Sequence, residues 1–222
     1  MRVLLGGGTG LIGNAVIGLG PSAGIELVGV GRRATGKLAQ ELVTRFTDIP
    51  PLPAADAAIC ALGTTLRNAG SRDAFRAVDY EAVIAFARAA QTAGVSRFAV
   101  VTAVGANAGS KVFYSRVKGD TEDALTRLGF SRLDIVRPGL LIGHRSERRP
   151  VESLLQALSP AMDAFMLGPW RDYRSVTAEA VAACLLGLSK LTAPGIFVHH
   201  HNEIMAIAAQ SDAMSHQAKR SR

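Results

Sequence analysis

The chain has 222 residues, of which 48% are hydrophobic, so its length and apolar content suit one substantial domain with a large core. Its 25 basic and 18 acidic side chains give a net charge of +7, but these charges are dispersed and no nucleic-acid-binding motif is present. No stretch approaches the roughly 20 uninterrupted apolar residues that a membrane span needs. We therefore expect a cytoplasmic protein with neither a nucleic-acid partner nor a membrane segment.

A glycine-rich segment follows the first apolar run, residues 3–5, and precedes a helix-compatible stretch, residues 14–19. Between a strand and a helix, such a segment presents backbone N–H groups to a phosphate, and the helix dipole favours the negative charge. Gly7 permits a tight turn, Gly10 allows close approach of a pyrophosphate, and Gly13 allows close packing of helix on strand. The predicted dinucleotide-binding residues of this segment are Gly7, Thr9, Gly10, Leu11, Ile12 and Gly13.

A second apolar strand, residues 25–30, runs into Gly31 and then into Arg32 and Arg33. In the NAD-type fingerprint an acidic residue at this point binds the ribose 2′-hydroxyl, whereas arginine side chains favour a 2′-phosphate. The pattern therefore predicts NADP(H) in preference to NAD(H). A surface loop with two solvated arginines is the alternative interpretation.

The middle of the chain alternates between helical and strand-like patterns. We expect a short helix over residues 37–43, a short strand over 45–49, and a buried parallel strand over 56–63. A helix over residues 72–92, with apolar residues on one face, leads into a strand over 97–102.

Residues 111–128 are predicted to form a helix that carries Tyr114 and Lys118 one turn apart on the same face. A free tyrosine, with a pKa of about 10, is a poor acid-base catalyst near neutrality, but an adjacent ammonium group stabilises its phenolate. The pair therefore favours proton transfer at Tyr114, with Lys118 also placed to hold the nicotinamide ribose. Two solvated neighbours on a helix surface are the alternative for this spacing.

Strands that alternate with helices imply right-handed crossovers and a doubly wound parallel sheet. A further strand is expected over residues 131–136, after which the pattern loosens. We expect an α/β, Rossmann-type single domain over residues 1–222, with a small elaboration at 140–222 partly on the substrate side. The elements expected in that elaboration are helices over 151–158, 177–191 and 202–210 and a strand over 195–199.

The cysteines and histidines favour no metal site. Cys60 and Cys184 lack CxxC spacing and are expected to be buried, reduced thiols. Residues 199–201 are three consecutive histidines, whose side chains alternate in direction along a strand and cannot converge on one ion from it.

Together with the glycine turn, four segments carry a resemblance to a known family. The segments are residues 60–65 (CALGTT), 68–70 (NAG), 114–119 (YSRVKG) and 137–139 (RPG). On these motifs the chain resembles the short-chain dehydrogenase/reductase superfamily, and more closely its atypical group that includes the Tat-interacting oxidoreductase-like protein.

The resemblance implies a Rossmann-type fold that binds NADP(H), with Tyr114 as proton donor and Lys118 lowering the phenol pKa. A serine or threonine orients the substrate carbonyl in such enzymes; here Thr102 takes that place, and Ala103 departs from the usual serine pair. The other residues that the resemblance implicates are Asp48 and Ile49 near the adenine, Ala61, Leu62, Gly63 and Thr64 along the dinucleotide, and Pro138, Gly139 and Leu140 over the nicotinamide end.

Three functions fit these residues. The first is an NADP(H)-dependent oxidoreductase that acts on a small carbonyl or alcohol, its substrate being a small molecule. The second is an NADPH-binding sensor or scaffold without turnover, which the departure at Ala103 favours, and the third is an epimerase or isomerase that retains its cofactor. A homodimer, formed through a helix such as 111–128, is a further open possibility.

Overall fold

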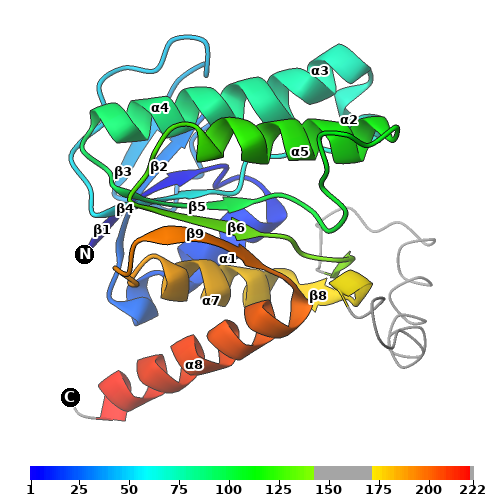
Figure 1. The fold of residues 1–222 in the computed structure, drawn as a ribbon. Coiled ribbons are helices and arrows are strands. Elements are labelled where there is room, and N and C mark those ends of the chain that lie inside the picture. Colours follow the sequence, from blue (N-terminus) through cyan, green and yellow to red (C-terminus); the bar gives the residue numbers. More distant parts are fainter. Residues whose placement is uncertain (143–171, 221–222) are drawn as a thin grey trace.

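The computed structural model describes residues 1–142 and 172–220, and within them seven parallel strands form one sheet in the order β3-β2-β1-β4-β5-β6-β9 (Figure 1). The order reverses between β1 and β4, which is the position where doubly wound sheets open a ligand crevice. This topology confirms the predicted Rossmann-type α/β fold. The strands are β1 (Arg2–Gly6), β2 (Glu26–Gly31), β3 (Gln40–Val43), β4 (Ala57–Cys60), β5 (Arg97–Val101), β6 (Arg132–Val136) and β9 (Gly195–His199).

Helices cover both faces of the sheet (Figure 1). One face carries α1 (Leu11–Leu19) and α7 (Ala178–Leu188), and α8 (His201–Arg220) packs against α7. On the opposite face lie α3, a π-helical turn η2, α4 and α5. Their bounds are α3 (Arg72–Arg76), η2 (Ala77–Ala82), α4 (Val83–Thr92) and α5 (Phe113–Thr126).

The short elements lie at the ends of the longer ones. A 3₁₀ turn, η1 (Pro21–Ala23), follows α1, and α2 (Leu66–Ala69) precedes α3. Two short parallel strands, β7 (Leu141–Ile142) and β8 (Val176–Thr177), pair outside the main sheet.

Strand β1 shows why the central strands are continuous apolar runs. Val3 and Leu5 pack into the core on the α1 and α7 side, whereas Leu4 between them packs into the core on the α4 side. Successive side chains of a strand point to opposite faces, and helices cover both faces here, so the three residues at 3–5 are all apolar and buried.

Two predicted elements are wrong. Residues 37–43 do not form the predicted helix: residues 40–43 are strand β3, which pairs parallel with β2 from Val28 opposite Gln40 onward. Residues 45–49, predicted as a strand, form a turn closed by the hydrogen bond from Asp48 N to Arg45 O, 3.1 Å. The helix-forming composition of 37–43 is overridden because the open edge of β2 offers backbone hydrogen bonds that only an extended segment can satisfy.

The remaining elements within the described residues are confirmed, with altered bounds. The helix predicted over 72–92 is interrupted by η2, and the last helix extends well beyond residue 210. The helix predicted over 151–158 lies outside the described residues. Cys60 and Cys184 are buried free thiols as predicted, and burial raises the pKa of each to about 12.

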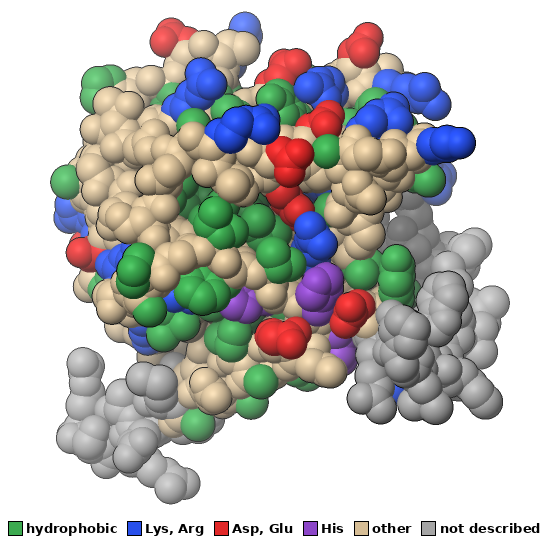
Figure 2. Space-filling model, viewed as in Figure 1, with side chains coloured by type: hydrophobic (Ala, Val, Ile, Leu, Met, Phe, Trp, Pro, Cys, Tyr) green, Lys and Arg blue, Asp and Glu red, His purple; other side chains and the backbone are tan. Residues whose placement is uncertain are grey.

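The described helices include none with the length and apolar character to cross a bilayer. Basic and acidic side chains alternate along the upper part of the face shown in Figure 2, in keeping with the dispersed charge of the sequence.

Candidate functional site

A cleft of about 1480 Å³ opens at the carboxyl ends of β1, β2 and β4, at the point where the strand order reverses. Ordinary small-molecule pockets measure roughly 300–1,000 Å³, so this cleft has room for a dinucleotide. Most of the predicted site residues line it: Gly7, Thr9, Gly10, Leu11, Ile12, Arg32, Arg33, Ala61, Leu62, Gly63, Thr64, Thr102, Tyr114 and Lys118.

The glycine turn has the geometry of a phosphate cradle. Gly7 has a φ of +89°, and a Cβ there would lie 2.6 Å from the carbonyl oxygen of Ala61. Gly13 lies behind the cleft, where a Cβ would stand 2.1 Å from the Gly7 carbonyl oxygen. Gly10 caps α1 in an extended conformation, and no side chain accepts a hydrogen bond from the first helical turn. These residues fit a pyrophosphate, because the bare turn and the free amide groups of the helix start face the same space.

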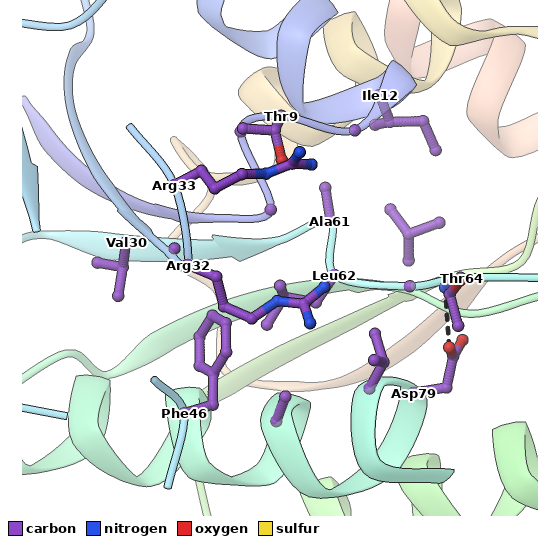
Figure 3. A pocket seen from close by; sticks show the side chains of 18 of the residues that line it. Thr9, Ile12, Val30, Arg32, Arg33, Phe46, Ala61, Leu62, Thr64 and Asp79 are labelled. Carbon is purple, nitrogen blue, oxygen red and sulfur yellow. Dashed lines mark hydrogen bonds between the residues drawn. The ribbon is translucent and has the colours of Figure 1, made fainter. Parts of the chain in front are cut away.

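The two arginines that follow β2 both extend into this cleft (Figure 3). Arg33 points toward the glycine turn at Thr9, whereas Arg32 points toward Leu62. Phe46 contributes an aromatic ring to the lining on the same side. The arginines therefore present two guanidinium groups at the end of the cleft where the adenosine half of a dinucleotide would lie.

Glu41 of β3 also lines the cleft, and the neighbouring loop at 35–36 donates hydrogen bonds to its carboxylate. Its carboxylate accepts hydrogen bonds from the backbone N–H groups of Thr35 and Gly36, both at 2.9 Å, and from the Thr35 hydroxyl. The hydrogen bond from the Thr35 hydroxyl is the main reason that the pKa of Glu41 lies below its ordinary value. The same loop carries Lys37, whose Nζ contacts Asn14 Oδ1 at 2.7 Å. Glu41 is not among the predicted site residues, because the composition of residues 37–43 favours a helix that would not join the sheet edge.

The structure does not place Asp48 and Ile49 in the cleft lining, where the resemblance put them. The turn at 45–48 brings Phe46 and Thr47 to the cleft in their stead. Ile49 packs against the apolar core on the α4 side, because the chain has already turned away from the cleft at that point.

Tyr114 and Lys118 lie on α5 and both line the cleft. The ring of Tyr114 packs against Phe75, with centroids 5.5 Å apart. Lys118 Nζ lies 2.7 Å from Asp79 Oδ1, and Asp79 Oδ2 accepts a hydrogen bond from Thr64 N at 2.8 Å (Figure 3). Asp79 is not among the predicted site residues, although an acidic residue four positions after Phe75 falls on the apolar face of the predicted helix and indicates a buried, partnered charge.

Thr102 lines the cleft but its hydroxyl proton is engaged. Thr102 Oγ1 donates to Glu122 Oε1 at 2.6 Å, and Arg137 Nε donates to the same oxygen at 3.0 Å. A hydroxyl has one proton, so in this arrangement Thr102 can accept a hydrogen bond from a ligand and cannot donate one. Ala103 beside it is buried.

The segment that was expected to close over the nicotinamide end is held by backbone contacts outside the cleft lining. Pro138 O accepts a hydrogen bond from Val104 N at 3.1 Å, and a Cβ on Gly139 would lie 2.3 Å from Arg174 O. Neither residue, nor the exposed Leu140, lines the cleft, and Leu141 is the first residue after them that does. The carbonyl of Leu140 is held by Val176 N as β7 pairs with β8.

His199 and His200 contact different acidic residues. His199 Nε2 lies 2.8 Å from Asp134 Oδ1, and His200 Nδ1 lies 3.5 Å from Asp172 Oδ2. The described residues contain no cluster of three or more His, Cys, Asp or Glu side chains that could hold a metal ion.

Comparison with known proteins gives a match to the HIM1 family model over residues 31–166, which is more than half of the chain. "Protein FMP52, mitochondrial" of Coccidioides immitis is 37% identical over 131 residues, 59% of this chain and 53% of that protein, so the match spans about half of the relative's length. The protein of the same name from Meyerozyma guilliermondii is 30% identical over 226 residues, covering 96% of this chain and 97% of that protein. Protein HTATIP2 of Rattus norvegicus is 33% identical over 146 residues, 66% of this chain and 57% of that protein, which confirms the resemblance seen in the motifs.

The fungal names overturn the cytoplasmic location expected from the sequence, because these relatives are named as mitochondrial proteins. The expectation rested on the lack of a membrane span, and this property does not distinguish the cytoplasm from the interior of a mitochondrion.

Solved structures share the fold. Human epimerase family protein SDR39U1 (isoform 2) with NADPH aligns with a TM-score of 0.65 at 20% identity, covering 90% of this chain and 74% of that chain. MoeE5 in complex with UDP-glucose and NAD aligns with a TM-score of 0.69 at 16% identity, covering 95% of this chain and 81% of that chain. These structures therefore share the Rossmann-type fold of this chain.

Proposed function

We propose that this chain, which belongs to the HIM1 family, is an NADP(H)-dependent oxidoreductase of the atypical short-chain type that acts on a small carbonyl or alcohol. One observation carries the proposal. A single cleft brings together the glycine turn after β1, the arginines after β2 and the Tyr114–Lys118 pair of α5, which lie far apart in the sequence.

The preference for NADP(H) rests on charge. Arg32 and Arg33 extend into the cleft, where a 2′-phosphate gains two charge-assisted contacts that a 2′-hydroxyl cannot make. Glu41 also lines the cleft, and the hydrogen bonds that it accepts from Thr35 and Gly36 reduce the repulsion that a 2′-phosphate would meet. Of the two solved structures with this fold, one holds NADPH and the other NAD, so the side chains around the adenosine ribose determine which cofactor is preferred.

A bound nicotinamide supplies or accepts the hydride, and the residues of this chain handle the proton and the orientation. Tyr114 donates its phenolic proton to the substrate oxygen during reduction and takes it back during oxidation. Lys118 lies buried beside Asp79, where its remaining N–H donors are available to ribose hydroxyls. Thr102, whose own proton is held by Glu122, does not donate a hydrogen bond to the substrate carbonyl.

Calorimetric titration with NADPH and NADH tests the cofactor assignment. Native protein is expected to prefer NADPH, and the variant Arg32→Ala/Arg33→Ala is expected to lose that preference, since hydrogen bonds to charged groups contribute about 1.5–3 kcal/mol each. Arg88→Ala/Arg127→Ala removes the same charge from exposed positions outside the cleft lining and should leave both affinities unchanged. Equal affinities of the native protein for the two nucleotides would overturn the NADP(H) assignment.

A second candidate function, an NADPH-binding sensor without turnover, is favoured by the engaged proton of Thr102 and by Ala103. It predicts NADPH binding, no turnover across a wide panel of carbonyl compounds, and a partner whose affinity depends on the nucleotide. A steady-state rate that falls strongly in Tyr114→Phe supports the oxidoreductase, whereas a rate that Tyr114→Phe leaves unchanged shows that Tyr114 is not the proton donor. Substrate conversion without net change in NADPH absorbance would indicate an epimerase.

A further inference from the structure

Asp79 stands between the two parts of the cleft that would meet the nicotinamide half of a dinucleotide. We propose that Asp79 is a positioning residue, which fixes the Lys118 ammonium group and the loop at 63–65 relative to each other before the nucleotide binds. This inference rests on the proposed function, because it concerns the same cleft.

Both carboxylate oxygens of Asp79 are committed to these two partners. Oδ1 lies 2.7 Å from Lys118 Nζ, and Oδ2 accepts a hydrogen bond from Thr64 N at 2.8 Å. The side chains of Asp79 and Lys118 are 0% and 6% exposed. Water therefore does not compete for these contacts, and the lysine is held in one place although it has a long and flexible stem.

The backbone around Asp79 is fixed by the helix that carries Lys118. Asp79 lies in the π-helical turn η2, a rare conformation that is frequent at functional sites. The Thr121 hydroxyl of α5 donates to the backbone carbonyl of Asp79 at 2.8 Å. Residues of α5 thus contact both the backbone and the side chain of Asp79, and these two contacts fix the distance between η2 and α5.

The loop side of the arrangement leaves room for a ligand. A Cβ on Gly63 would lie 3.4 Å from Asp79 Oδ1 and 3.7 Å from Lys118 Nζ, so the ion pair faces a position that lacks a side chain. An ammonium group has three donors, and the pair with Asp79 leaves donors of Lys118 for ligand oxygens. The Lys118 ammonium group is therefore already in place beside the backbone of Gly63 before a ligand arrives. This preorganisation lowers the entropic cost of ordering both groups on binding.

A positioning role makes a prediction that a general structural role does not. Asp79, which pairs with Lys118, lies beside Thr64 on one side of the cleft, whereas Arg32 and Arg33 lie on the other side (Figure 3). Loss of Asp79 should therefore weaken NADPH, which reaches both sides, and spare adenosine 2′,5′-bisphosphate, which lacks the nicotinamide half.

The experiment compares Asp79→Asn with Asp120→Asn by calorimetry, using NADPH and adenosine 2′,5′-bisphosphate as ligands. Asp120 lies on α5, the same helix as Lys118, and forms a partly exposed ion pair with Arg76 at 3.0 Å. Asp120→Asn therefore removes one carboxylate, as Asp79→Asn does, and serves as the matched control. Asp79→Asn is expected to raise the Kd for NADPH on the order of 10-fold and to change the other Kd by less than about 2-fold. Asp120→Asn should change neither.

A double-mutant cycle with Lys118→Gln shows whether Asp79 acts through the lysine. If the two residues form one unit, the double variant should bind NADPH about as weakly as the weaker-binding single variant, whereas independent contributions would multiply and overturn the proposal. Asp79→Glu replaces Asp79→Asn if that variant does not fold, because it retains the charge but shifts the carboxylate. A higher Kd for NADPH, with an unchanged Kd for adenosine 2′,5′-bisphosphate, is expected for this variant as well. A Kd for NADPH equal to that of the native protein would overturn the proposal.

The outcomes separate this inference from the proposed function. Native protein that binds neither ligand would refute the proposed function. Native protein that binds both ligands, with Asp79→Asn binding NADPH equally well, would refute only the role of Asp79.

Discussion

Replacing Gly13 by alanine tests the close packing that shapes the phosphate cradle. A Cβ at this position would lie 2.1 Å from the carbonyl oxygen of Gly7 and 2.8 Å from the Cα of Gly8. Ordinary contact of a Cβ begins at 3.4 Å, so the start of α1 must move away from the glycine turn by on the order of 1 Å. The obstructing atoms are backbone, which cannot rotate aside as a side chain can.

Gly18 on the same helix provides the matched control, because a Cβ there meets nothing within 4 Å. Both substitutions gain up to about 1 kcal/mol of helix propensity, so the difference in stability between them isolates the cost of overpacking, about 1–3 kcal/mol. In a protein of this size each kcal/mol shifts Tm by about 2–4 °C. We therefore expect Gly13→Ala to melt about 2–12 °C below Gly18→Ala.

Thermal unfolding followed by circular dichroism measures this difference, with urea titration as a check on the free energy of unfolding. Gly13→Ala should also bind NADPH more weakly, because displacement of the helix start moves the amide groups that face the cleft. Equal Tm values for the two variants would show that the contact between helix and glycine turn is not as tight as the geometry requires.

Two further predictions concern the buried polar groups outside the cleft. Asp134→Asn removes the carboxylate that holds the buried Arg132 at 2.7 Å, and should lower the free energy of unfolding by about 3–5 kcal/mol in urea titration. Glu26→Gln, in a solvent-exposed ion pair, should cost less than about 1 kcal/mol, and similar costs for the two variants would contradict the prediction. Burial raises the pKa of Cys60 and Cys184 to about 12, so at pH 8 both thiols remain protonated, and an alkylating reagent should modify them only after denaturation. Rapid alkylation of the native protein would argue against that burial.

The segments whose structure depends on local requirements could be predicted from the sequence. The run before Gly7 is apolar at every position because both faces of β1 are covered, and the glycines recur where a side chain would strike the backbone. The Tyr114–Lys118 spacing fixes one helix face by geometry alone. These signals predicted the Rossmann-type sheet and most of the cleft lining.

The tertiary structure decided what depends on contacts between distant segments. Residues 37–43 have helix-forming composition, but residues 40–43 form β3 because the edge of β2 offers backbone hydrogen bonds, and this pairing brings Glu41 to the loop at 35–36. The pairing of Asp79 with Lys118 and the engagement of Thr102 by Glu122 arise only when α5 is packed on the sheet.

The sequence by itself therefore determined the order of the elements and the positions where only glycine fits, because both are local properties of the backbone and of burial. The tertiary structure alone decided which charged and polar groups meet in the cleft. Their partners are chosen by the packing of helices on the sheet, and a buried charge is tolerated only where that packing supplies a partner.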